Sequence, residues 1–221
     1  GVEFQSHLDG SKHMFTPEIS MEIQRDLGSD IIMSFDDCPP GDANHETIKN
    51  AVNRTTEWMK RCHKWLSDNP ERYGHEQVVF PIIQGGTDHK LRRISIEQLS
   101  PYSSAGMAIG GLAVGEEKSA MLDTVEYCDE ILPKDQPRYL MGVGRPSDIV
   151  AAVRRGVDMF DCVMPTRNGR NGHIFTSKGV INIRNEKYKD DMSPLDNESS
   201  HPWGQKFSRS YVSHLFNIHE V

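Results

Sequence analysis

Short apolar runs alternate along most of the chain with longer segments in which apolar residues recur at helical spacing. The runs predict strands, and the periodic segments predict helices. The expected strands are residues 30–35, 78–83, 105–109, 139–143 and 157–163. The expected helices are residues 45–68, 88–99, 116–132 and 147–155. Apolar strands that alternate with helices indicate a parallel sheet with helices packed on its faces.

Polar or glycine residues lie at or just past the carboxyl ends of five predicted strands. They are Asp36, Gln84, Gly110, Gly142 and Asp161. A (β/α) barrel gathers its active site at this end of its strands, whereas an open doubly wound sheet would place it at one switch point. We therefore predict the α/β class and a (β/α)8 TIM-type barrel. The barrel is expected to be incomplete in this chain, with at least two strands before the first residue.

The two ends of the chain follow other patterns. Residues 1–15 alternate around an Asp-Gly turn and predict a hairpin, and residues 16–28 predict a helix with a capping threonine and a terminal glycine. After the strand–helix repeat stops, a second hairpin is expected at 173–183, followed by a turn-rich, irregular insertion. We predict two domains, a partial barrel at 1–171 and a hairpin with an irregular C-terminal segment at 172–221.

Composition narrows the class of protein without fixing its function. Of the 221 residues, 36% are hydrophobic and 26% are charged, which is typical of a globular protein. The formal net charge of −7 argues against a generally basic nucleic-acid binder. Locally, residues 165–189 contain six Lys or Arg and one Glu, a balance of +5 that suits contact with RNA.

Cysteine usage and hydropathy indicate the compartment. The four cysteines include no Cys-x-x-Cys pair, so neither a disulfide framework nor a cysteine-rich metal site is expected. No apolar run is long enough to cross a bilayer. These observations predict a reduced, cytoplasmic protein without a membrane partner.

Residues 157–172 combine a carboxylate in an apolar setting with nearby cations. Asp161 lies within a predicted apolar strand, where burying a carboxylate is costly unless it is paired or used. Arg167 and Arg170 follow in a polar turn and offer planar guanidinium groups suited to phosphate. The pattern suggests a nucleophile that acts on a phosphate-bearing substrate. Taken alone, however, such a pattern more often marks an aspartate that caps a turn beside two solvated arginines.

Six collinear motifs resemble those of the tRNA-guanine transglycosylases. They are SHLDGSKH (6–13), FDDCPP (35–40), IIQGG (82–86), IGGLAVGE (109–116), YLMGVGRP (139–146) and GVDMFDCVMPTRNGRNG (156–172). The resemblance extends from the first residues to about Gln205. It implies a barrel enzyme that replaces the wobble guanine of tRNA with a 7-deazaguanine during queuosine biosynthesis.

The resemblance also implies which residues carry the reaction. Asp161 matches the nucleophile of the family, which attacks C1′ of the ribose and holds the RNA covalently while the bases exchange. Arg167 and Arg170 match positions that grip the tRNA anticodon loop, whose bases can be splayed out. The family's second catalytic aspartate, its general acid/base, is expected before the first residue.

A base pocket is implied at the ends of the other strands. Asp36 matches the residue that reads the pyrimidine-like edge of the base. Gln84 and the backbone of Gly111 and Leu112 match further polar contacts, and Met141 matches a residue that covers one face of the ring. The ligands implied are guanine and the 7-deazaguanine that replaces it.

Three further positions bear on which base is bound. Cys38 and Val114 match the bacterial form of the pocket, which suits the small base 7-aminomethyl-7-deazaguanine (preQ1). Glu116 is expected either to orient a nearby peptide or to contact the aminomethyl group. A carboxylate at the start of a helix is also common without any such role.

The sequence departs from the family at its structural zinc site. Ser199, His201 and Gly204 occupy the positions of three zinc-binding cysteines, and serine and glycine are not zinc ligands in practice. We therefore predict no zinc and no other cofactor in this chain. The family dimerises partly through this subdomain, so a homodimer is a weaker expectation here.

Three functions remain open at this stage. The leading one is a base-exchange enzyme, because a binding module has no use for a nucleophile such as Asp161. The second is an inactive paralogue, fragment or partner subunit that binds RNA or base, which the loss of the zinc cysteines favours. The third, a sugar-cleaving barrel unrelated to RNA, would call for paired carboxylates and aromatic platforms rather than arginines beside the nucleophile.

Overall fold

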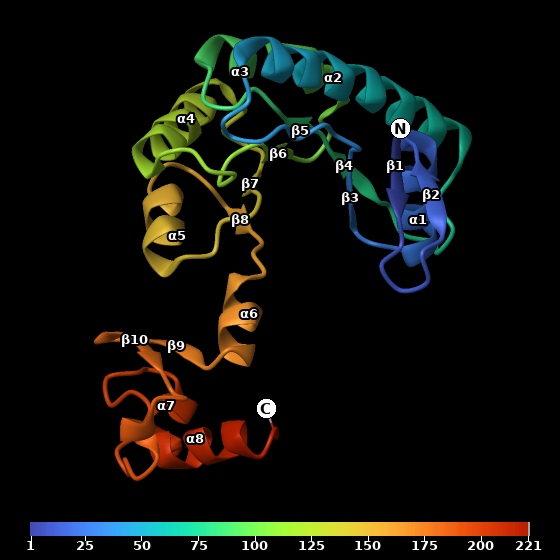
Figure 1. The fold of residues 1–221 in the computed structure, drawn as a ribbon. Coiled ribbons are helices and arrows are strands. Elements are labelled where there is room, and N and C mark those ends of the chain that lie inside the picture. The colour runs from blue at the N-terminus through green and yellow to red at the C-terminus, as the bar shows by residue number, and fades with distance from the viewer. Residues whose placement is uncertain (221) are drawn as a thin grey trace. The chain divides into compact units, whose positions relative to one another are not determined.

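The computed structural model describes residues 1–220 and divides the chain into two compact units, Gly1–Asp161 and Cys162–Val221 (Figure 1). The division falls earlier than the domain boundary predicted at residue 171. Each unit has a hydrophobic core of its own. In the part of the chain that is described, no helix is both long and apolar enough to cross a membrane.

Parallel strands in the first unit confirm the predicted α/β class. They are β3 (Ile31–Met33), β4 (Val78–Phe80), β5 (Ile82–Ile83), β6 (Met107–Ile109), β7 (Arg138–Leu140) and β8 (Met159–Phe160). β3 pairs with β4, while β5, β6, β7 and β8 follow one another in chain order in a second sheet. Pro81 has no N–H for a ladder and divides the strand expected at 78–83 into β4 and β5. Within residues 1–220 these strands form part of a barrel that does not close.

Helices cover the outer face of these strands. They are α1 (Pro17–Leu27), α2 (His45–Asp68), α3 (His89–Leu99), α4 (Lys118–Ile131) and α5 (Pro146–Val153), with a short 3-10 helix η1 (Ser100–Tyr102). Figure 1 shows α2, α3 and α4 in succession along the outside of the strands. Both predicted ends of the first helix are confirmed. The Thr16 side chain accepts a hydrogen bond from the Ile19 amide, and Gly28 takes the left-handed conformation with φ 68°.

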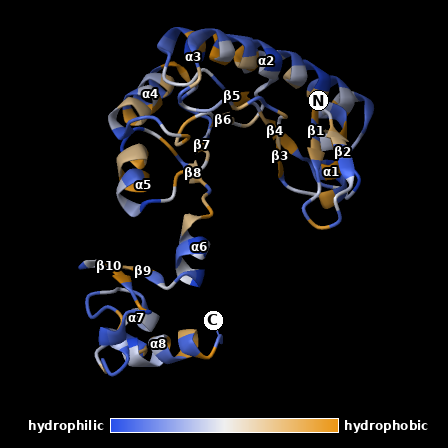
Figure 2. Ribbon diagram, viewed as in Figure 1, coloured by the Kyte–Doolittle hydropathy of each residue, from blue (hydrophilic) through white to orange (hydrophobic). Residues whose placement is uncertain are grey.

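The main core lies between the sheet and these helices. Met59, Leu99 and Val125, one from each of α2, α3 and α4, are fully buried against Ile109 and Leu140 of the strands. Figure 2 shows hydrophilic residues along the outward side of α2, opposite this core. Each helix packs against the sheet because only one of its faces is apolar and is buried there. This packing fixes the positions of the strands, and therefore of their carboxyl ends.

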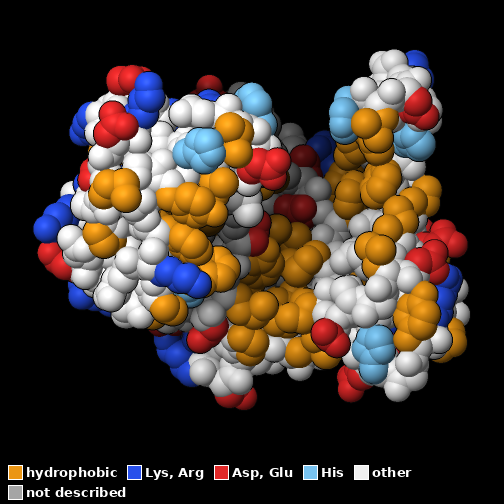
Figure 3. All heavy atoms as spheres, turned by 90° about the horizontal axis from the view of Figure 1, so that it is seen from below, with side chains coloured by type: hydrophobic (Ala, Val, Ile, Leu, Met, Phe, Trp, Pro, Cys, Tyr) orange, Lys and Arg blue, Asp and Glu red, His pale blue; other side chains and the backbone are white. Residues whose placement is uncertain are grey.

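The N-terminal hairpin is also confirmed. β1 (Val2–Gln5) and β2 (Lys12–Phe15) pair in antiparallel register. Apolar side chains on it, including Val2, Phe4 and Met14, remain exposed. Figure 3 shows further hydrophobic side chains at the surface on the face turned toward the viewer.

The stretch around Asp161 differs from its prediction in two ways. The expected strand 157–163 is reduced to β8, because only Met159 and Phe160 pair with β7. Asp161 therefore follows the strand and is exposed, not buried inside it. The polar turn expected next is the short helix α6 (Met164–Arg170), in which a proline occupies the first turn, where its missing N–H costs nothing.

The second unit is built on an antiparallel hairpin and a small core. β9 (His173–Thr176) and β10 (Gly179–Asn182) confirm the second predicted hairpin. The other elements are the 3-10 helix η2 (Glu186–Tyr188) and the helices α7 (Pro202–Lys206) and α8 (Arg209–Asn217). Ile183, Tyr188 and Phe216 form the core. The prediction of an irregular segment after this hairpin is therefore wrong at residues 202–206, which form α7.

Candidate active site

Two polar side chains that follow different strands meet at the carboxyl end of the first unit's sheets. Nε2 of Gln84, after β5, donates a hydrogen bond of 2.6 Å to Oδ2 of Asp36, after β3. Gln84 is fully buried, and its backbone amide donates to Oγ of Ser95 on α3 at 3.1 Å. Burial raises the pKa of Asp36, while the hydrogen bond from Gln84 acts in the opposite direction. The geometry thus brings together two residues 48 positions apart that the sequence had named separately.

The glycines after β6 make room for this pair. A Cβ on Gly111 would lie 2.2 Å from Oε1 of Gln84, and a Cβ on Gly110 would lie 2.8 Å from Nε2. Gly111 also has φ +63°, where glycine alone is unstrained. Oε1 of Gln84 is buried and has no hydrogen-bond partner within residues 1–220. An unpartnered buried acceptor is costly, so a water molecule or ligand that donated to it would stabilise this position.

The same loop presents a free backbone donor. Leu112 is 4% exposed, yet the hydrogen bonds of residues 1–220 include none donated by its amide. A free backbone amide and a carboxylate such as that of Asp36 are the groups that suit a planar ligand carrying N–H donors beside a carbonyl acceptor.

Cys38 is an exposed residue, but its sulfur lies near Asp36, Gln84 and Gly111. Burial of the sulfur is the main cause that raises the pKa of the Cys38 thiol, and the charge of Asp36 raises it further. The Gly111 amide and the Gln84 carboxamide lie close enough to the sulfur to act in the opposite direction. A thiol with a raised pKa is neutral at neutral pH, so Cys38 contributes a polarisable surface beside Asp36 and Gln84 rather than a nucleophile.

Glu116 fixes the loop that carries Val114. Its Oε1 accepts a hydrogen bond from the Ala113 amide at 2.5 Å, and its Oε2 accepts one from the Val114 amide at 3.0 Å. Ala113 has φ 58°, an uncommon conformation for a residue with a Cβ, and the paired carboxylate compensates for that strain. Of the two roles expected for Glu116, this geometry favours the orientation of a peptide. A cavity of about 290 Å³ adjoins the loop, with Lys118 and Arg145 among its lining residues.

Asp161 forms a second group at the end of β7 and β8. Its Oδ1 accepts hydrogen bonds from the Tyr139 hydroxyl at 2.8 Å and from the Gly142 amide at 3.0 Å. Burial, followed by the hydrogen bond to Asp161, raises the pKa of Tyr139 to about 12, so the phenol remains a donor at neutral pH. Among the described residues, no donor reaches Oδ2 of Asp161. One oxygen is held and the other is free, an arrangement that suits a carboxylate nucleophile.

The other predicted site residues make no side-chain hydrogen bond to these two groups among the described residues. Met141 directly follows β7 and is half-buried, with its amide donating to Ile109 O at 3.3 Å. Arg167 and Arg170 lie in the last turn of α6, in the second unit, and both are exposed.

Sequence reasoning missed Tyr139 and the buried Arg92, which donates to the backbone carbonyls of Ile83, Gly86 and Gly111 around Gln84, and it did not connect Gly142 with Asp161. Tyr139 and Gly142 stood within a quoted motif, but nothing in their spacing pointed to Asp161. Arg92 lies four residues before Ile96 and seven before Leu99, on the apolar stripe of α3, which is the one signal that could have marked it as buried.

Zinc does not fit the residues at the positions that resemble the family's zinc site. A Cβ on Gly204 would lie 2.5 Å from Cβ of Ser199, so these two positions pack directly on each other. Nδ1 of His201 accepts a hydrogen bond from the Trp203 amide at 3.4 Å. Residues 1–220 contain no group of three or more His, Cys, Asp or Glu side chains that could hold a metal.

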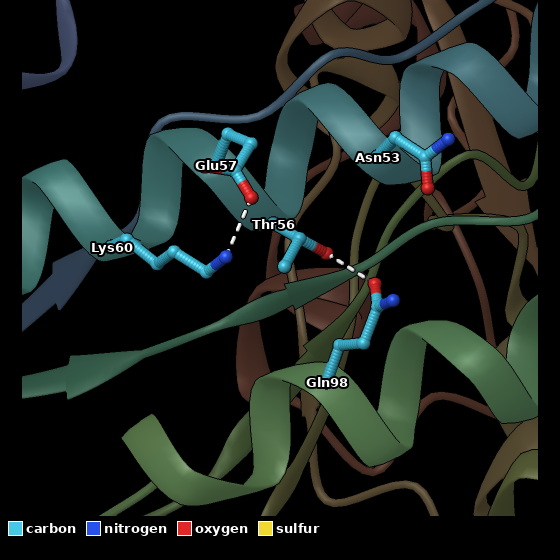
Figure 4. A pocket seen from close by; sticks show the side chains of 5 residues that line it. All are labelled: Asn53, Thr56, Glu57, Lys60 and Gln98. Carbon is cyan, nitrogen blue, oxygen red and sulfur yellow. Dashed lines mark hydrogen bonds and ion pairs between the residues drawn. The ribbon is translucent and has the colours of Figure 1, made fainter.

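A separate pocket of about 240 Å³ lies between α2 and α3 (Figure 4). It is lined by Asn53, Thr56, Glu57, Lys60 and Gln98. Thr56 donates to Oε1 of Gln98 at 2.8 Å, and Lys60 pairs with Glu57 at 2.5 Å, so these four lining residues are engaged with each other in pairs. This pocket is between helices and holds none of the predicted site residues.

Comparison with known proteins identifies relatives along the whole chain. A family model described as queuine tRNA-ribosyltransferase matches residues 1–221. The chain is similar to proteins named queuine tRNA-ribosyltransferase from Ruegeria pomeroyi (48% identical), Caldanaerobacter subterraneus subsp. tengcongensis (50%) and Francisella tularensis subsp. novicida (50%). All of this chain is covered in each case, but only 57%, 58% and 59% of the respective relative.

Proposed function

The chain belongs to the queuine tRNA-ribosyltransferase family, and from that premise we propose that it carries the base pocket and the nucleophile of a tRNA base-exchange enzyme. The reaction replaces a guanine in the anticodon loop with the 7-deazaguanine preQ1, as a step in queuosine biosynthesis. The observation that carries the proposal is the hydrogen-bonded pair of buried Gln84 and half-buried Asp36 beside Gly111, with an acceptor and an amide left free.

The base fits this pair by its hydrogen-bonding edge. Guanine and preQ1 both present an N–H and an amino group beside a carbonyl. The Asp36 carboxylate accepts from the two donors, and the Leu112 amide donates to the carbonyl. Met141 covers the ring, and Cys38 and Val114 leave room for the small aminomethyl group. This edge is common to both bases, which is what an exchange reaction requires.

The nucleophile acts through the free oxygen of Asp161. Oδ2 forms a bond to C1′ of the ribose as the bond from C1′ to the guanine nitrogen breaks, and the electron pair leaves with guanine, which takes up a proton from a general acid, the role that the family gives to a second aspartate. The incoming base loses its ring N–H proton to the same group, which then acts as a base, and attacks C1′, and the carboxylate departs. Two inversions give net retention at C1′. Tyr139 and Gly142 hold the other oxygen in place throughout.

RNA binding, compartment and assembly complete the proposal. Arg167 and Arg170 would contact phosphates of the anticodon loop, because forked guanidinium groups match phosphate oxygens. We place the reaction in the cytoplasm, where tRNA is modified. A homodimer remains a prediction.

A binding-only role is the second candidate. It is favoured by Ser199 and Gly204 at two positions where the family has zinc ligands, because a changed RNA-docking subdomain is compatible with loss of turnover. It predicts that the protein binds RNA or base without ever forming a covalent intermediate.

Covalent trapping tests the enzyme reading. The protein is incubated with a guanine-bearing anticodon stem-loop and 9-deazaguanine, then separated on a denaturing gel. We expect a band shifted by the mass of the RNA, because a carboxylate–ribose ester survives denaturation. RNA that binds on a native gel but gives no shifted band would establish the binding-only role. Absence of both would refute both readings for this chain.

Metal removal tests the second unit. We propose that it folds without zinc, because Ile183, Tyr188 and Phe216 supply a core and Ser199 packs on Gly204 where ligands would converge. Treatment with EDTA is expected to change the melting temperature by less than about 1 °C, whereas zinc-dependent modules unfold when chelated. A drop of several degrees that added zinc reverses would contradict this. Metal analysis of the untreated protein provides the control.

A further inference from the structure

Tyr139 is a half-buried residue whose hydroxyl reaches the proposed nucleophile from the neighbouring strand. It lies in β7, which runs beside β8 (Figure 1), and the ladder places Tyr139 opposite Met159. Successive side chains of a strand point to opposite faces, and Leu140 and Phe160 pack in the core on the helix side. Tyr139 and Met159 therefore lie on the other face, from which Tyr139 contacts Asp161, two residues further along.

Two donors of different kinds converge on one oxygen of the nucleophile. Oδ1 of Asp161 accepts hydrogen bonds from the Tyr139 hydroxyl at 2.8 Å and from the Gly142 amide at 3.0 Å. The amide belongs to the backbone, so it holds the carboxylate whichever side chain stands at position 139. A phenylalanine there would fill nearly the same volume. What the hydroxyl adds is therefore a hydrogen bond whose strength follows the charge on Asp161.

The charge on Asp161 changes twice during the proposed exchange. The side chain is a carboxylate before it attacks C1′, a neutral ester while it holds the RNA, and a carboxylate again after the incoming base has attacked. A hydrogen bond to a charged acceptor is roughly twice as strong as one to a neutral acceptor. Tyr139 therefore stabilises the free carboxylate more than it stabilises the ester.

We propose that Tyr139 is a positioning residue that makes the Asp161 carboxylate a better leaving group when the covalent RNA intermediate breaks down. The proposal rests on the proposed function, because it assumes that Asp161 bonds to C1′. In this step a base nitrogen bonds to C1′ as the bond from Oδ2 to C1′ breaks, and the electron pair of that bond stays on the carboxylate. The phenol keeps its proton, because burial, followed by the hydrogen bond to Asp161, raises its pKa to about 12.

The hydroxyl affects breakdown of the intermediate more than its formation. Cleavage at an anomeric carbon passes through an oxocarbenium-like transition state, in which the carboxylate is only loosely bonded to C1′. Asp161 therefore keeps most of its charge in the transition state, as in the free enzyme, and loses it only in the ester. Removing the hydroxyl destabilises the free carboxylate and the transition state alike, so formation changes little. Breakdown starts from the ester, which is destabilised less, so its barrier rises.

The test measures both steps in the wild-type protein, in Tyr139→Phe and in Tyr127→Phe. Tyr127→Phe is the matched control, because it removes a phenol hydroxyl that accepts a hydrogen bond from Arg93, between α3 and α4. Adduct formation with the guanine-bearing stem-loop and 9-deazaguanine is timed on denaturing gels. The isolated adduct is then mixed with saturating guanine, and its breakdown is timed. We expect Tyr139→Phe to slow breakdown about five- to tenfold and to leave formation within about twofold. Tyr127→Phe should change neither rate.

A second measurement varies the strength of the donor with little change in its size. 3-Fluorotyrosine incorporated at position 139 donates a stronger hydrogen bond, so its adduct should break down at least as fast as the wild-type adduct. Breakdown as slow as in Tyr139→Phe would overturn the role of Tyr139. An equal loss of both rates in Tyr139→Phe, or no change in breakdown, would overturn it too. If the wild-type protein itself formed no adduct, the proposed function would fail, and the role of Tyr139 with it.

Discussion

In the Asp161→Asn variant, the covalent RNA adduct is expected to disappear, with adduct formation reduced by at least about a thousandfold. The carboxamide keeps the shape of the side chain, and its oxygen can still accept hydrogen bonds from Tyr139 and Gly142. What it lacks is the negative charge on the free oxygen, and a neutral amide is a very poor nucleophile toward C1′. The measurement is the denaturing gel with the guanine-bearing stem-loop and 9-deazaguanine.

The matched control is Asp135→Asn, which makes the same change at an exposed aspartate in the turn between α4 and β7. It should give the wild-type amount of adduct. Binding of the stem-loop on a native gel should persist in both variants, because neither substitution touches the cationic residues. An adduct that formed normally in Asp161→Asn would show that another group is the nucleophile.

The sequence predicted the order of strands and helices and the bounds of the long helices well, because both depend on local patterns. Apolar runs and helical periodicity located α2, α3 and α4 to within about two residues. The position of Asp36, Gln84 and Gly111 after successive strands predicted that they lie together at the carboxyl edge of the sheet. That success follows from a rule of parallel sheets, in which successive strands present their carboxyl ends on the same side.

Burial and pairing were harder to predict, because they depend on what lies opposite in space. Asp161 stands within an apolar run, yet the strand that carries it pairs through two residues only and ends before it. The acceptors of Arg92 come from residues 83, 86 and 111, a combination that no local pattern contains. Tyr139 likewise reaches Asp161 across two neighbouring strands, at a register fixed by the ladder. Such contacts are set by tertiary packing, which overrides local pattern.

The Gly111→Ala variant is expected to bind guanine about 10- to 100-fold more weakly than the wild-type protein. A Cβ at this position would lie 2.2 Å from Oε1 of Gln84, so the carboxamide must move away from Asp36. Losing a hydrogen bond to a charged, partly buried carboxylate costs about 1.5–3 kcal/mol. The left-handed backbone at φ +63° costs a residue with a Cβ about 1 kcal/mol of folding stability, which lowers the melting temperature rather than the affinity. Since a tenfold change in affinity corresponds to roughly 1.4 kcal/mol, the lost hydrogen bond alone accounts for the expected weakening.

Gly74→Ala separates the two causes. Gly74 has φ +74°, and no heavy atom lies within 4 Å of where a Cβ would be, so this variant adds the backbone strain without the clash. We expect both variants to melt at slightly lower temperatures and only Gly111→Ala to lose guanine affinity by calorimetry. If the two variants bound guanine with equal affinity, Gln84 would have no part in recognising the base. The Asp36 carboxylate would then have to read the base alone, and the buried, unpartnered Oε1 of Gln84 would have no ligand to complete it.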